Sequence, residues 1–88
     1  MIWDNINQDL DTLSPVTATA EDYLAMGMKY CLGHGVPADN VTAHKWLNIA
    51  AIKGCEKAKT YRLELAREMT AGEVAEAQRQ ARSFLTIH

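Results

Sequence analysis

The fold is decided by residues 26–54, which read MGMKYCLGHGVPADNVTAHKWLNIAAIKG. Gly33 and Gly35 interrupt any helix that reaches them, because glycine favours turns over helix interiors. A second helix can then start at a polar cap, either Asp39 or Asn40. The stretch therefore predicts two helices joined by a tight return.

The side chains of this stretch are spaced so that two helices can interlock. Gly27 has no side chain and lets the first helix approach the second closely, while Tyr30, one turn later, can fill the gap beside it. Ala43, Trp46 and Ala50 recur on one stripe of the second helix and alternate small with large. Every one of these residues is explained by packing, and none requires chemistry.

Further helix signals lie on both sides of this stretch. Thr19 is a predicted N-cap, with Asp22 three positions later, for a helix through about residue 32. Gly54 is placed to end the second helix, which runs to residue 53, in the left-handed conformation. Val36 can plug the bottom of the core. No segment alternates with a period of two, so we expect an all-α fold.

Two more helices are expected toward the C-terminus. One covers about residues 56–68, and its inward stripe consists of Ala58, Tyr61, Leu65 and Met69. Thr70 and Glu73 form a predicted capping box for a last helix through about residue 85. The inward residues of that helix are Val74, Ala77, Ala81, Phe84 and Leu85.

The N-terminal segment, residues 1–14, is predicted to be a short amphipathic arm. Ile2, Ile6, Leu10 and Leu13 recur at helical spacing. A helix of about a dozen residues is not stable alone, so we expect the arm to dock on something. It can dock on its own chain, on a second copy or on a partner, and the sequence leaves these alternatives open.

The run from Met26 to Asp39 resembles the Sel-one-like repeat, a relative of the tetratricopeptide repeat. The family pattern reads L-G-x-x-Y-x-x-G-x-G-V-x-x-D, followed by A-x-x-W-x-x-x-A-A-x-x-G, and only the opening leucine is replaced here, by Met26. The residues that carry this motif and its packing are Tyr23, Met26, Gly27, Tyr30, Gly33, Gly35, Val36, Asp39, Ala43, Trp46, Ala50, Ala51 and Gly54.

The resemblance implies antiparallel helical hairpins of an α-α superhelix within one domain, residues 1–88. It places one repeat at residues 19–54, between the N-terminal arm and a capping helical pair at 55–88, where the pattern becomes degenerate. Some family members carry a disulfide between neighbouring helices. Cys55 stands at one such position, but Ala51 stands where its partner is expected, which argues against that bond. The resemblance also suggests a bacterial source.

Composition narrows the functional classes. The chain has 88 residues, a net charge of −2 and two cysteines, which fits one small domain with reduced thiols. We expect no membrane span and no secretion signal, hence a cytoplasmic protein. Charge is uneven: residues 1–39 carry six acids and one base, whereas residues 40–88 carry eight bases and five acids. This asymmetry can steer a partner, or it can reflect two differently solvated faces.

The sequence gives little indication of a metal-binding or catalytic site. A metal site would draw on Cys31, His34, His44, Cys55 and His88. Only Cys31 and His34 have suitable spacing, across a helix end, and loop polarity or helix-surface histidines explain these residues more simply. We expect no cofactor, no nucleic-acid partner and no enzymatic activity, because basic residues alternate with acids and no nucleophile is paired with a base.

The predicted partner-binding surface lies on the first repeat helix. If Tyr23, Met26, Gly27 and Tyr30 face the second helix, the offset positions line the face that such repeats use for peptides. Those positions are Glu21, Leu24, Met28, Cys31 and Leu32. Four of the five are apolar, so we expect this face to be covered. Either an external protein or peptide binds there, or the N-terminal arm packs on it. The competing hypotheses are a self-associating structural protein, such as a homodimer, and a metal- or ligand-dependent regulator.

Overall fold

The computed structural model describes residues 18–87, which contain four helices and no strand. The helices are α2 (Ala20–Leu32), α3 (Asn40–Ile52), α4 (Glu56–Ala66) and α5 (Ala71–Ile87). The all-α prediction is confirmed for this part of the chain. The predicted arm at residues 1–14, with Ile2, Ile6, Leu10 and Leu13, lies outside the described residues, and so does His88.

Capping residues in the sequence set both ends of α2. The backbone nitrogen of Thr19 donates to Asp22 Oδ2 at 2.8 Å, and the backbone nitrogen of Asp22 donates to Thr19 Oγ1 at 3.2 Å. This capping box satisfies two amide groups that have no partner within the helix. At the other end Gly33 has a φ of 72° and donates its N–H to the Lys29 carbonyl.

The loop and the next helix follow the same logic. Asp39, not Asn40, is the N-cap of α3, and its Oδ1 accepts from the backbone nitrogens of Val41 and Thr42 at 3.1 and 3.2 Å. Gly54 has a φ of 108°, in the region that favours glycine. The predicted turn between α3 and α4 therefore forms at the predicted residue.

The last two helices differ slightly from their predicted bounds. α4 ends at Ala66 instead of Glu68, because the chain must turn before the cap of the next helix. That cap forms as predicted: the backbone nitrogen of Thr70 donates to Glu73 Oε1 at 2.8 Å, and that of Glu73 donates to Thr70 Oγ1 at 3.1 Å. α5 then extends to Ile87, two residues beyond the prediction.

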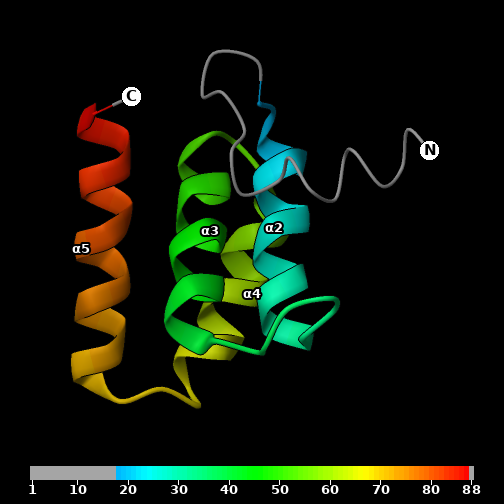
Figure 1. Ribbon diagram of the computed structural model, residues 1–88. Coiled ribbons are helices and arrows are strands. Elements are labelled where there is room, and N and C mark those ends of the chain that lie inside the picture. The colour runs from blue at the N-terminus through cyan, green and yellow to red at the C-terminus, as the bar shows by residue number, and fades with distance from the viewer. Residues whose placement is uncertain (1–17, 88) are drawn as a thin grey trace.

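α3 is the central helix of the arrangement. Its backbone packs closely against α2, α4 and α5. In Figure 1, α3 stands between α2 and α5, and α4 lies behind them. α4 and α5 each pack extensively against α3, whereas any backbone contact between α4 and α5 is minor. α4 and α5 therefore do not form a second tight hairpin like that of α2 and α3.

One hydrophobic cluster joins all four helices. Its buried members are Tyr23, Met26, Ala43, Trp46, Leu47, Ile49, Ala50, Ala51, Cys55, Ala58, Leu65 and Ala81. The predicted inward positions Tyr23, Met26, Ala43, Trp46 and Ala50 are therefore confirmed as core. Ala77 is also fully buried, as the inward stripe of the last helix predicts.

Gly27 marks the closest approach of α2 to α3. A Cβ atom built at Gly27 would lie 2.7 Å from Leu47 Cδ2, 2.8 Å from Leu47 Cγ and 3.2 Å from the Leu47 backbone nitrogen. A side chain at that position would therefore force Leu47 to shift. The predicted reason for a glycine here is confirmed, and the residue that it accommodates is Leu47.

Tyr30 is half-buried and packs against the edge of the core, and the ring that stacks on Trp46 is that of Tyr23. Two predicted packing roles were wrong. Val36 is half-buried and lies outside the hydrophobic cluster, so it does not plug the core. Tyr61 was expected on the inward stripe of α4 but is 38% exposed, because that helix meets α3 through Ala58 and Leu65.

Candidate interaction surface

The five predicted partner-binding residues do not form one uniformly open face. Leu24, Met28 and Cys31 are half-buried and pack against the edge of the hydrophobic cluster. Glu21 and Leu32 are exposed, and the side chain of Leu32 is 56% exposed. The structure thus gives α2 an apolar flank whose middle leans on the core and whose C-terminal end is open to solvent.

The orientation of α2 explains this gradient. Tyr23, Met26 and Gly27 are buried, as expected for the side of α2 that packs on α3. Successive residues on a helix are separated by about 100°. Leu24 and Met28 follow the buried positions directly, so they lie beside the seam and not opposite it. Both residues are half-buried and pack against the hydrophobic cluster.

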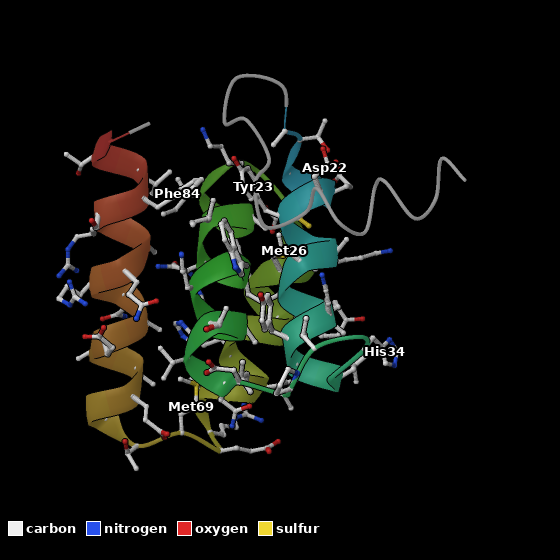
Figure 2. The ribbon with its side chains drawn as sticks, in the orientation of Figure 1. Asp22, Tyr23, Met26, His34, Met69 and Phe84 are labelled. Atoms are coloured by element: carbon white, nitrogen blue, oxygen red, sulfur yellow. The ribbon has the colours of Figure 1, made fainter. Side chains whose placement is uncertain are left out.

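An aromatic cluster ties α2, α3 and α5 together. The Tyr23 and Trp46 rings are stacked, with centroids 5.7 Å apart and planes 9° apart. Phe84 meets both rings edge-on, at 5.1 Å from Trp46 and 6.0 Å from Tyr23. Figure 2 shows Phe84 directed from α5 toward α3. Sequence reasoning placed all three residues inward but did not pair them.

A lysine covers part of this cluster. Lys45 Nζ lies 4.4 Å from the Trp46 ring centroid and 5.8 Å from that of Phe84. An ammonium group over an aromatic face is attracted by the ring's quadrupole. The cluster already has a cation of its own chain above it, and we assign it a structural role.

Two buried polar atoms have no hydrogen-bond partner among the described residues: Tyr23 Oη and His44 Nδ1. Burial raises the pKa of Tyr23, and the neighbouring charge of Asp22 raises it further. Burial lowers the pKa of His44, and the positive charge of Arg62 lowers it further. Both residues are therefore held in their neutral forms at neutral pH.

The expectation that His44 lies on a helix surface was wrong, because its side chain is only 2% exposed. α3 is covered by three helices, so even positions off its main apolar stripe are buried. The sequence signal that could have revealed this is the apolar character of α3, which extends over most of its circumference.

The predicted metal candidates are not brought together. Cys31 is half-buried and Cys55 is buried, and both are free thiols. His34 lies in the exposed loop and points away from the helices (Figure 2). Within residues 18–87, no group of three histidine, cysteine, aspartate or glutamate side chains is placed to hold a metal ion.

A hollow of mixed polar and apolar lining lies where α3 and α5 begin, and it is lined by Tyr30, Pro37, Ala38, Asp39, Asn40 and Glu73. Its two carboxylates are already used as helix caps. Asp39 accepts from Val41 and Thr42, and Glu73 accepts from Thr70. We therefore interpret the hollow as a consequence of two capped helix ends.

Comparisons of the chain with protein-family models, with curated proteins and with solved structures each found no match. Of the helices that the structure describes, none has the length and apolar character needed to cross a membrane. The remaining evidence on function is therefore the surface itself. Within residues 18–87, the exposed large apolar residues besides Leu32 are Ile52 at 60%, Leu63 at 61% and Tyr61 at 38%.

Proposed function

We propose that this chain is a small protein-binding module that holds a partner protein or peptide on the outer flank of α2 and catalyses no reaction. The observation that supports this proposal is the apolar flank formed by Leu24, Met28, Cys31 and Leu32, which ends in a largely exposed leucine. Exposed apolar side chains that adjoin a core are typical of surfaces that bind another protein.

The proposal includes a scaffold of the Sel-one-like type. The α2–α3 pair corresponds to one repeat, and α4 and α5 act as its terminal cap. The close approach at Gly27 and the turn glycines Gly33 and Gly54 support this, because the repeat's motif has a physical use at each of these positions. On this proposal the protein works in the cytoplasm with both thiols reduced.

The chemistry of the flank indicates the kind of partner. Leu24, Met28 and Cys31 follow one another at spacings of four and three residues, which suits an apolar stripe of a second helix. Methionine adapts its shape to varied apolar partners. Glu21 lies exposed near the N-terminal end of the flank and favours a basic side chain there. The proposed partner segment is therefore an amphipathic helix with an apolar stripe and a basic end.

Charge substitutions test this proposal. Leu32→Glu and Met28→Glu place a carboxylate on the flank, and desolvating that charge against an apolar partner costs affinity. Proteins captured from the native host by the parent chain would be identified and their affinities measured with each variant. We expect Leu32→Glu to weaken specific binding at least about tenfold, a loss of about 1.4 kcal/mol.

Leu63→Glu is the matched control. Leu63 is as exposed as Leu32 but lies on α4, away from the flank. The Leu63→Glu variant should bind the partner like the parent chain. Circular dichroism should show that all three variants remain helical. If Leu63→Glu lost the partner and Leu32→Glu kept it, the binding surface would lie on α4 and the proposal would be wrong.

Self-association is the second candidate. It is favoured by exposed apolar residues on two further helices, Ile52 at the end of α3 and Leu63 on α4. Sedimentation velocity over a range of concentrations separates the candidates, since a self-associating chain sediments faster as concentration rises. A monomer at every concentration would exclude self-association. A metal- or ligand-dependent regulator is a weaker third candidate, which elemental analysis of the purified protein would test.

A further inference from the structure

We propose that His44 is a proton-sensitive latch between α3 and α4, so that acidification below neutral pH weakens the attachment of α4 while the α2–α3 pair stays formed. The inference does not depend on the interaction proposed for α2. It rests on where this imidazole is buried and on which charged group lies beside it.

His44 is the one buried side chain of polar or charged type among the described residues. Its Nδ1 is buried without a hydrogen-bond partner. A buried polar atom without a partner is costly, and a buried charge without a partner is costlier still. The neutral imidazole is therefore favoured in this seam: burial and the Arg62 charge both lower the pKa of His44 and outweigh a backbone hydrogen bond that raises it.

Arg62 brings a permanent positive charge to the same seam. Its Nη1 donates to Asn48 Oδ1 at 2.6 Å, and Asn48 follows His44 by one turn of α3. The two ion pairs found in the described part of the chain, Lys59–Glu56 and Arg79–Glu76, do not involve Arg62. A neutral amide therefore positions the guanidinium group, and its charge is left to act on a protonated His44.

The charged group that shifts the pKa of His44 is Arg62, and no acid is among the causes of this shift. α2 presents Tyr23, Met26 and Gly27 as its buried residues, and α5 presents Ala77, Ala81 and the half-buried Phe84. Tyr23 is the one titratable group among them, and its raised pKa keeps it neutral. On α3 itself, Lys45 lies over Trp46 and adds positive charge. A proton on His44 thus meets positive charges and apolar side chains.

The direction of the pH effect follows. The pKa of His44 is lowered in the folded state, first by burial and then by Arg62, whereas an unfolded histidine titrates near pH 6.5. Between the lowered pKa of the folded state and about pH 6.5, the unfolded chain therefore binds up to one proton more at His44 than the folded chain. Stability is full above this pH and is lost as the pH falls toward the lowered pKa of the folded state.

Urea unfolding of the full chain between pH 7.5 and 5.5 tests the latch, because carboxylates titrate mainly below this window. In the parent chain we expect the unfolding equilibrium constant to rise by up to about tenfold per pH unit below about pH 6.5. His44→Gln should remove this dependence. His34→Gln, which changes an exposed loop histidine, should keep it. Equal pH dependence in the parent chain and in His44→Gln would overturn the proposal.

A second variant and a second measurement protect the test if His44→Gln does not fold. Arg62→Gln keeps His44 but removes the neighbouring charge, so the acid sensitivity should shrink without vanishing. NMR titration of the parent chain should give His44 a pKa below the value of about 6.5 for an unfolded histidine, and a pKa at or above that value would overturn the proposal. Hydrogen exchange, corrected for intrinsic rates, should show α4 losing protection at pH 5.5 before α2 does; simultaneous loss would contradict the latch.

Discussion

The α2–α3 pair and the two C-terminal helices differ in the size of the side chains that they bury. The largest fully buried side chains, Tyr23, Met26, Leu47 and Ile49, all belong to α2 and α3. The fully buried residues of α4 and α5 are Ala58, Ala77 and Ala81. Burial of apolar area contributes about 25 cal/mol per Å², so alanines contribute far less than large side chains. We infer that stability is concentrated in the first pair.

The two regions also differ in how closely their helices pack. α2 and α3 pack closely along the seam at Gly27, whereas α4 and α5 each lean on α3. Local unfolding starts where few large apolar contacts hold an element. The difference indicates that α4 and α5 depend on α3 more than α3 depends on them.

Trp46→Ala is expected to have the largest effect, because this ring contacts both regions. It stacks on Tyr23 of α2 and meets Phe84 of α5. Removing a buried tryptophan side chain costs about 3–5 kcal/mol, which is close to the whole stability of a domain of this size. Urea unfolding would measure the loss. Ile52→Ala, on the same helix but exposed, should change stability by less than about 0.5 kcal/mol.

Gly27→Ala tests the close approach of α2 to α3. The new methyl group would overlap Leu47, and overpacking costs about 1–3 kcal/mol, partly offset by the alanine helix preference of about 1 kcal/mol. Gly72→Ala is the matched control in α5, where the added Cβ meets only Thr70 Oγ1 at 3.9 Å. It should stabilise the chain slightly. If thermal unfolding showed equal effects at both glycines, the seam would not be tight.

Tyr23→Phe should raise stability, although it lies in the better-packed region. The hydroxyl group is buried without a partner, and such a group costs about 1–2 kcal/mol. The phenyl ring keeps the stacking on Trp46. Tyr61→Phe, at an exposed position, should be neutral. A loss of stability in Tyr23→Phe would show that the hydroxyl group has a partner after all.

Substitutions at the helix caps are expected to have the smallest effects on stability. They allow a direct comparison, because each region has one capping box. Thr19→Ala and Thr70→Ala each remove the hydroxyl group of a capping box, and each should cost about 0.5–1 kcal/mol. Hydrogen exchange should show that Thr70→Ala loosens only α5, whereas Thr19→Ala lowers protection throughout, since α2 belongs to the stable pair. Identical exchange patterns would mean that the two regions unfold as one unit.

Helix bounds were largely predictable from short-range signals. Both capping boxes, the Asp39 cap and the turn at Gly54 form as the sequence predicts. The hydrogen bonds of these caps join residues two or three positions apart, so they need no knowledge of the rest of the fold. The exposure of the apolar flank of α2 was predicted less well, since Leu24 and Met28 are half-buried.

The sequence by itself determined where the helices begin and end and which residues share a face, because capping and helical periodicity act over a few residues. Only the tertiary structure decided how many neighbours each face receives. Three helices pack around α3 and His44 is buried, whereas α4 packs extensively only on α3 and its Tyr61 is exposed. Burial depends on contacts between distant segments, and those contacts turn an ordinary histidine into a proton-sensitive group.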